Sequence, residues 1–152
     1  MNIVIKTLSH LLLVCLALSL MLGCTSPTTP PPSDTSLGPA DRVDVVYFHR
    51  TQRCYSCIYA EDGIRYTVET YFADELASGK VTFQSINVQD EANADIVEKY
   101  NNASYLTLCI NTVRDGTDHI EVVTDIWLVI GNDEAFAEVV KNKIEKSLEG
   151  EG

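Results

Sequence analysis

The chain has 152 residues, with 22 Asp and Glu against 11 Lys and Arg, which gives a formal net charge of −11 at pH 7. A chain of this length folds as one domain of ordinary size, so a multidomain enzyme is excluded. Such an acidic surface repels phosphate backbones, which argues against a nucleic-acid partner. Five cysteines are too few for a fold held together by disulfides.

The first 23 residues have the pattern of an export signal. Lys6 precedes an apolar run over residues 11–22, and the run ends at a glycine followed by Cys24. This segment resembles a bacterial lipoprotein signal, which implies cleavage before Cys24 and attachment of the lipid to that cysteine. The alternative is an uncleaved signal anchor, because residues 3–22 supply the ~20 residues that a spanning helix needs. Either reading predicts an extracytoplasmic, membrane-anchored protein.

Residues 24–40 contain all five prolines of the chain and are otherwise rich in Thr and Ser. A segment of this composition builds no core and runs as extended chain. We therefore predict that residues 24–40, with the lipid attachment cysteine at their start, tether a folded domain at residues 41–150.

Periodic patterns in this domain predict seven main elements. Short β-branched and aromatic runs indicate four strands, at 42–49, 81–88, 105–113 and 119–126. Apolar stripes at spacings of three and four indicate three helices, with stripes over 58–76, 96–100 and 136–148. The second helix is expected over residues 90–100, and residues 132–134 are expected to cap the third. The turn sequence at 114–117 predicts that the last two strands form a hairpin.

The order strand, helix, strand, helix, strand, strand, helix predicts an α/β fold with a four-stranded mixed sheet and helices on both faces. This is similar to a minimal thioredoxin-like arrangement, without the additional first strand and helix of thioredoxin itself.

A Cys-x-x-Cys pair stands where the first strand passes into the first helix. A helix N-terminus offers unpaired N–H groups and a partial positive charge, which favour a thiolate. We predict that Cys54 is the exposed nucleophile and Cys57 the buried resolving thiol. The neighbouring residues are expected to add positive charge or to face a substrate: Arg53, Arg50 and His49 in the first role, Tyr55 and Ser56 in the second.

Three other roles compete for the pair. One is part of a zinc site, for which the domain has only Cys109 besides the pair. Another is a static disulfide, although so short a loop constrains the unfolded chain little. The third is a Cu(I) site made by Cys54, Cys57 and His49, because soft thiolates suit that ion.

Residues 45–136 resemble the thioredoxin-like family called nitrophenyl compound nitroreductase subunit ArsF. The resemblance rests on residues 47–49 before the Cys-x-x-Cys pair, on 86–88, and above all on 126–136. It implies that Cys54 and Cys57 are the active residues. The family name implies no activity here, and no flavin site or other cofactor is predicted.

The chain also departs from thioredoxins. It has no proline after Pro39, whereas thioredoxins place a cis-proline opposite the cysteines. The equivalent corner here is formed by residues 103–105, where a cis bond would cost ~3 kcal/mol, so a trans bond is expected with Ser104 and Tyr105 facing the substrate. The place of the buried carboxylate of thioredoxins falls on Tyr47 or Phe48, and neither can exchange a proton in that way.

These patterns together predict a membrane-tethered thiol–disulfide oxidoreductase that acts on protein or small thiol and disulfide substrates. The alternatives are a thioredoxin-like Cu(I)-handling module and a non-catalytic binding module. Cys109 is expected to fill the core.

Overall fold

The computed structural model describes residues 38–150, so the predicted signal, the lipid attachment site Cys24 and the tether up to residue 37 lie outside the described residues. The strands are β1 (Arg42–His49), β2 (Val81–Asn87), β3 (Thr107–Arg114) and β4 (Thr117–Val123). The α-helices are α2 (Tyr55–Tyr71), α3 (Ala73–Ser78), α4 (Ala94–Lys99) and α5 (Asp133–Glu149). Two short 3-10 helices are η2 (Glu91–Asn93) and η3 (Asp125–Leu128). Among residues 38–150, no helix has the length and apolarity to cross a membrane.

The sheet has the strand order β2-β1-β3-β4. Strand β1 runs parallel to β2 and antiparallel to β3, and β3 forms an antiparallel hairpin with β4. Central β1 is buried from Val43 to Phe48, as expected for a strand covered on both faces. The mixed four-stranded sheet is therefore the one predicted.

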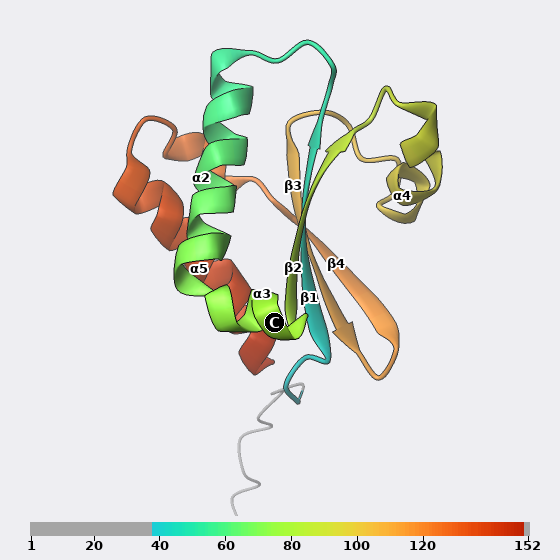
Figure 1. Cartoon of the computed structure of the whole chain (residues 1–152), viewed down its shortest axis with the longest axis vertical. Coiled ribbons are helices and arrows are strands. Elements are labelled where there is room, and N and C mark those ends of the chain that lie inside the picture. Colours follow the sequence, from blue (N-terminus) through green and yellow to red (C-terminus); the bar gives the residue numbers. More distant parts are fainter. Residues whose placement is uncertain (1–37, 151–152) are drawn as a thin grey trace, which may run out of the picture. The chain divides into compact units, whose positions relative to one another are not determined.

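Helices cover both faces of the sheet, which confirms the predicted α/β, thioredoxin-like class. Figure 1 shows α2 and α5 on one side of the sheet and α4 on the other. Side chains of β1 alternate between the two sides, as the pleat requires. Val45 and Tyr47 join the larger core with α2 and α5, whereas Val46 and Phe48 pack with Tyr100 in a smaller core.

Helices α2 and α5 pack closely because residue 63 has no side chain. A Cβ atom on Gly63 would lie 2.7 Å from the ring of Phe136, which is 1% exposed. The ring of Tyr59 meets Phe136 edge-on, with centroids 5.5 Å apart. Phe136 is thereby seated directly against the backbone of α2.

The first predicted helix is broken at Phe72, which departs from helical geometry with φ −128° and ψ 33°. The break directs the buried Phe72 and the half-buried Leu76 into the larger core, and the chain continues as α3 against β2. The second predicted helix likewise divides into η2 and α4. Gly79 ends α3 in a left-handed conformation, with φ 76°.

The fourth strand is shorter than predicted. It ends at Val123, and the turn of η3 carries the fully buried Ile126 into the core beside α5. The predicted hairpin turn is confirmed, since Asp115 and Gly116 both have positive φ, at 49° and 72°. The predicted cap of α5 is also present, because the side chain of Asn132 accepts a hydrogen bond from the N–H of Ala135.

Candidate functional site

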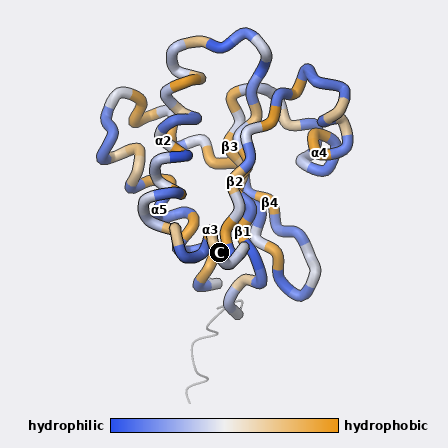
Figure 2. The backbone as a smooth tube through the Cα atoms, viewed as in Figure 1, coloured by the Kyte–Doolittle hydropathy of each residue, from blue (hydrophilic) through white to orange (hydrophobic). Residues whose placement is uncertain are grey.

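The two cysteines of the Cys-x-x-Cys pair form a disulfide at the start of α2. Cys54 is the residue that caps the helix, and the two Cα atoms lie 5.0 Å apart. Cys54 is exposed, whereas Cys57 is 2% exposed. Between them Tyr55 is exposed and Ser56 half-buried. The loop that leads into the pair from β1 is hydrophilic (Figure 2). The pair thus joins one exposed and one buried cysteine.

Each sulfur accepts a hydrogen bond from the backbone of the other cysteine. The N–H of Cys57 donates to Sγ of Cys54 at 3.2 Å, and the N–H of Cys54 donates to Sγ of Cys57 at 3.1 Å. The N–H groups at this end of a helix have no partner within the helix and carry its positive dipole end. After reduction, the N–H of Cys57 and the positive end of the helix dipole would stabilise a thiolate on Cys54.

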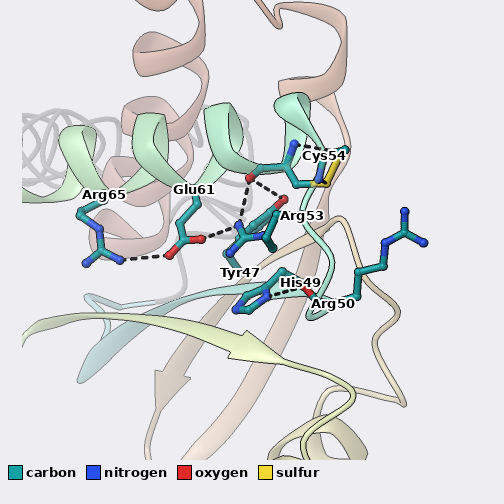
Figure 3. Close-up of polar contacts among 8 residues, drawn as sticks. Tyr47, His49, Arg50, Arg53, Cys54, Glu61 and Arg65 are labelled. Carbon is teal, nitrogen blue, oxygen red and sulfur yellow. Dashed lines mark hydrogen bonds and ion pairs between the residues drawn. A yellow bond between two sulfur atoms is a disulfide. The ribbon is translucent and has the colours of Figure 1, made fainter.

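Two side chains donate hydrogen bonds to the carbonyl group of Cys57 (Figure 3). The Tyr47 hydroxyl and an Nη of Arg53 each donate a hydrogen bond to this oxygen, both at 3.2 Å. Burial raises the pKa of Tyr47 to about 12, so its hydroxyl stays protonated and remains a donor. Tyr47 therefore fixes the first turn of α2. It stands at one of the two positions where the sequence comparison placed the buried carboxylate of thioredoxins.

Arg53 is ion-paired with Glu61, which lies one helical turn after Cys57. An Nη of Arg53 lies 2.5 Å from an Oε of Glu61, and the two side chains are only 21% and 16% exposed, respectively. An Nη of Arg65 lies 3.1 Å from the other carboxylate oxygen of Glu61. Burial raises the pKa of Glu61, but the hydrogen bonds from Arg53, Ser85 and Arg65 and the charge of Arg53 together outweigh it, so the net pKa lies below the ordinary value. The positive charge of Arg53, which was predicted to support the disulfide, is thus balanced by the carboxylate of Glu61 (Figure 3).

Sequence reasoning missed Glu61, because it looked for a buried acid only on the first strand. Of the two strand positions considered, Tyr47 faces α2, whereas Phe48 faces α4 in the smaller core. The available signal was the spacing of four residues from Cys57 to Glu61 and again from Glu61 to Arg65, which places all three along one side of a helix.

The other two residues that were predicted to add positive charge are His49 and Arg50, and their contacts differ from those of Arg53. His49 is half-buried, and its Nδ1 lies 3.0 Å from the carbonyl oxygen of Arg50. The side chain of Arg50 extends away from the disulfide (Figure 3). Its Cζ atom lies 4.7 Å from the centroid of the Tyr105 ring. Within residues 38–150, no group of three or more His, Cys, Asp and Glu side chains is placed to hold a metal ion. The Cu(I) hypothesis therefore gains no supporting observation.

The corner at residues 103–106 lies beside the end of β1. The N–H of Leu106 donates to the carbonyl of Phe48 at 2.8 Å, and both Ser104 and Tyr105 are exposed. Every peptide bond of the described residues is trans. The predicted substrate-facing residues Ser104 and Tyr105 thus lie at the end of the sheet from which the disulfide loop leaves.

The disulfide loop is anchored to the end of β2. The N–H of Thr51 donates to the Gln89 side chain at 3.0 Å, and the amide of Asn87 donates to the Thr51 hydroxyl at 2.9 Å. These bonds join the loop to the last residue of β2 and to the turn that follows it.

Cys109 is fully buried in the smaller core, opposite Val46 on β1. Burial raises the pKa of the Cys109 thiol to about 11, so this thiol stays neutral at physiological pH. Its place agrees with the predicted role as a core residue.

The chain matches no protein-family model and no curated protein. Thioredoxin O2 from Arabidopsis thaliana, in its oxidised state, is 17% identical with a TM-score of 0.42, over 70% of this chain and 73% of that one. A thioredoxin from Thermus thermophilus is 15% identical with a TM-score of 0.42, over 70% and 76%. A malarial protein is 16% identical with a TM-score of 0.40, over 66% and 96%. The chain has a thioredoxin-like fold, with the strand order β2-β1-β3-β4 and a Cys-x-x-Cys pair at the start of α2.

Replacing Glu61 with Gln should destabilise the protein by about 1–2 kcal/mol at pH 7, because the buried Arg53 charge loses its partner. The folded-state pKa of Glu61 is depressed, so its stabilisation is complete above the unfolded value and is lost as pH falls through the folded value. Urea denaturation should therefore show the difference shrinking below about pH 4. The control Glu69→Gln, an exposed position of α2, should change stability by less than ~0.5 kcal/mol. A difference between Glu61→Gln and wild type that is unchanged at pH 3 would contradict this role.

Proposed function

We propose that this protein is a thiol–disulfide oxidoreductase that uses Cys54 and Cys57 as its redox pair. The observation that carries the proposal is the exposed Cys54, whose sulfur is bonded to that of the buried Cys57 and accepts a hydrogen bond from an N–H at the start of α2. A sulfur in this position is open to a second thiol or disulfide and is stabilised as a leaving group.

The exchange proceeds in two balanced steps. In reduced protein, the Cys54 thiolate attacks a substrate disulfide, forms a mixed disulfide and releases one substrate sulfur as a thiolate, which takes up a proton from water. Deprotonated Cys57 then attacks the Cys54 sulfur, re-forms the Cys54–Cys57 disulfide and releases the second substrate thiolate. Two electrons pass to the substrate. The reverse sequence oxidises a substrate dithiol.

We also infer that the chain is related to the ArsF family. Support comes from the residue patterns at 47–49, 86–88 and 126–136. The first two stretches lie at the ends of neighbouring parallel strands, next to the loop that holds the disulfide. The relationship supports the role of the cysteine pair and assigns no substrate.

The proposed location is the extracytoplasmic face of a membrane, with the domain held by a lipid on Cys24. The apolar run at 11–22, followed by Cys24 and a proline-rich segment, supports this location. In bacterial cells fed a labelled fatty acid, the full chain should incorporate the label, and Cys24→Ser should lose it. The matched control Cys15→Ser should keep it. Label retained by Cys24→Ser would contradict lipid attachment at Cys24 and would favour a signal anchor.

The redox proposal predicts that Cys57→Ala traps a covalent adduct. After treatment with 2-hydroxyethyl disulfide, mass spectrometry should show a stable mixed disulfide on Cys54 of this variant, because no neighbouring thiol displaces it. Wild-type protein should instead return to the internal disulfide.

The control Cys109→Ala should behave as wild type does, since that thiol is buried on the other face of the sheet. Absence of an adduct from Cys57→Ala, or an adduct on Cys109, would overturn the proposed function.

A further inference from the structure

A groove of about 780 Å³ runs between α2 and α5 and begins at Tyr55, the residue next to the exposed sulfur of Cys54. Residues Tyr55, Ile58 and Tyr66 line it along α2, and Phe136 lines it from α5. The distance from residue 55 to 66 is about 16 Å at ~1.5 Å per helical residue. An extended chain of about five residues has this length, at ~3.3 Å per residue.

The walls of the groove are aromatic and exposed. Tyr55 is 80% exposed and Tyr66 58%, and large apolar surface gathered at one place marks an interaction site. The ring centroids of Tyr55 and Tyr59 lie 6.5 Å apart, and those of Tyr59 and Phe136 lie 5.5 Å apart. A row of rings thus connects the reactive end of α2 to the floor of the groove. Rigid aromatic side chains of this kind anchor bound proteins and peptides.

The charges of the groove all have one sign. Asp62, Asp133 and Glu134 line it, and no Lys or Arg is among the lining residues that the structure describes. At the far end, Lys141 contacts the ring of Tyr71 from outside and is paired with Glu145 at 3.2 Å. Carboxylates beside tyrosine faces attract cations both by charge and through the ring electrons.

We propose that this groove binds the segment of a protein substrate that flanks its reactive cysteine, and that it selects segments with basic and apolar side chains. The inference rests on the proposed function and adds the substrate class. The groove includes Tyr55, which follows Cys54 in the chain, so a substrate cysteine at Cys54 brings its neighbouring residues alongside α2. A second copy of this chain is a poor occupant, because each copy has a net charge of −11.

The test uses the reduced full chain and two peptides, each joined to 2-mercaptoethanol through a disulfide. The peptides are Arg-Leu-Cys-Leu-Arg and Glu-Leu-Cys-Leu-Glu, which differ only in charge. The second-order rate constant should be at least about tenfold higher for the basic peptide at low salt, and this preference should shrink as salt increases. Equal rates for the two peptides would overturn the inference.

Matched variants separate the groove from the overall charge of the protein. The double variant Asp62→Asn with Glu134→Gln should lower the basic-to-acidic rate ratio about fivefold. The control Asp95→Asn with Glu98→Gln removes two charges from exposed α4 on the other face of the sheet, and it should lower the ratio less than twofold. A loss as large for this control as for the groove variant would mean that net charge, and not the groove, sets the preference. That outcome would sink the inference.

Two further measurements keep the inference distinct from the redox proposal. If wild-type protein fails to exchange with 2-hydroxyethyl disulfide, the proposed function fails. If it exchanges but shows no peptide preference, only the groove inference fails. Binding of Arg-Leu-Ser-Leu-Arg, which cannot react, should shift the NMR signals of Ile58 and Tyr66 in the oxidised chain. Signal changes confined to α4, or equal affinity for the acidic serine peptide, would contradict binding in the groove.

Discussion

The start of helix α2 at Cys54 is the constraint on which the rest of the site depends. A helix that begins at this residue directs its unpaired N–H groups at the sulfurs and exposes one sulfur while burying the other. The neighbouring structure holds this start in place. Buried β1 supplies Tyr47 beneath the first turn, and the end of β2 anchors the preceding loop. The geometry of the pair therefore follows from the packing of the central strand.

The two sides of α2 carry different charges and serve different purposes in this account. On the inner side, Arg53 and Glu61 neutralise each other next to the Cys57 carbonyl, so the buried end of the disulfide meets a balanced pair. On the outer side, carboxylates line an aromatic groove that faces solvent. The inner side fixes the geometry of exchange, and the outer side offers contacts that could distinguish one substrate from another.

Local patterns sufficed for the number and order of the strands, the hairpin, the cap at Asn132 and the junction that carries the cysteines, because each depends on residues close in sequence. The strand ends were less accurate, since the third strand begins at Thr107 instead of residue 105 and the fourth ends at Val123 instead of residue 126. The break at Phe72 was not predictable in this way, since it depends on where the core lies in space. The direction of the Arg53 side chain and the role of Glu61 depend on contacts with β1, which helical spacing alone does not reveal. The groove requires a glycine on α2 to meet a ring on α5, two segments distant in the sequence.

The rate at which reduced protein reacts with iodoacetamide at pH 6 tests the central claim most directly. Peptide mapping would identify the modified residue, and the urea-unfolded chain would supply the reference rate for each thiol. The N–H contacts at the start of α2 predict that Cys54 reacts at least about tenfold faster folded than unfolded, while Cys57 and Cys109 are protected. A Cys54 thiol that reacts no faster in the folded protein would contradict the account.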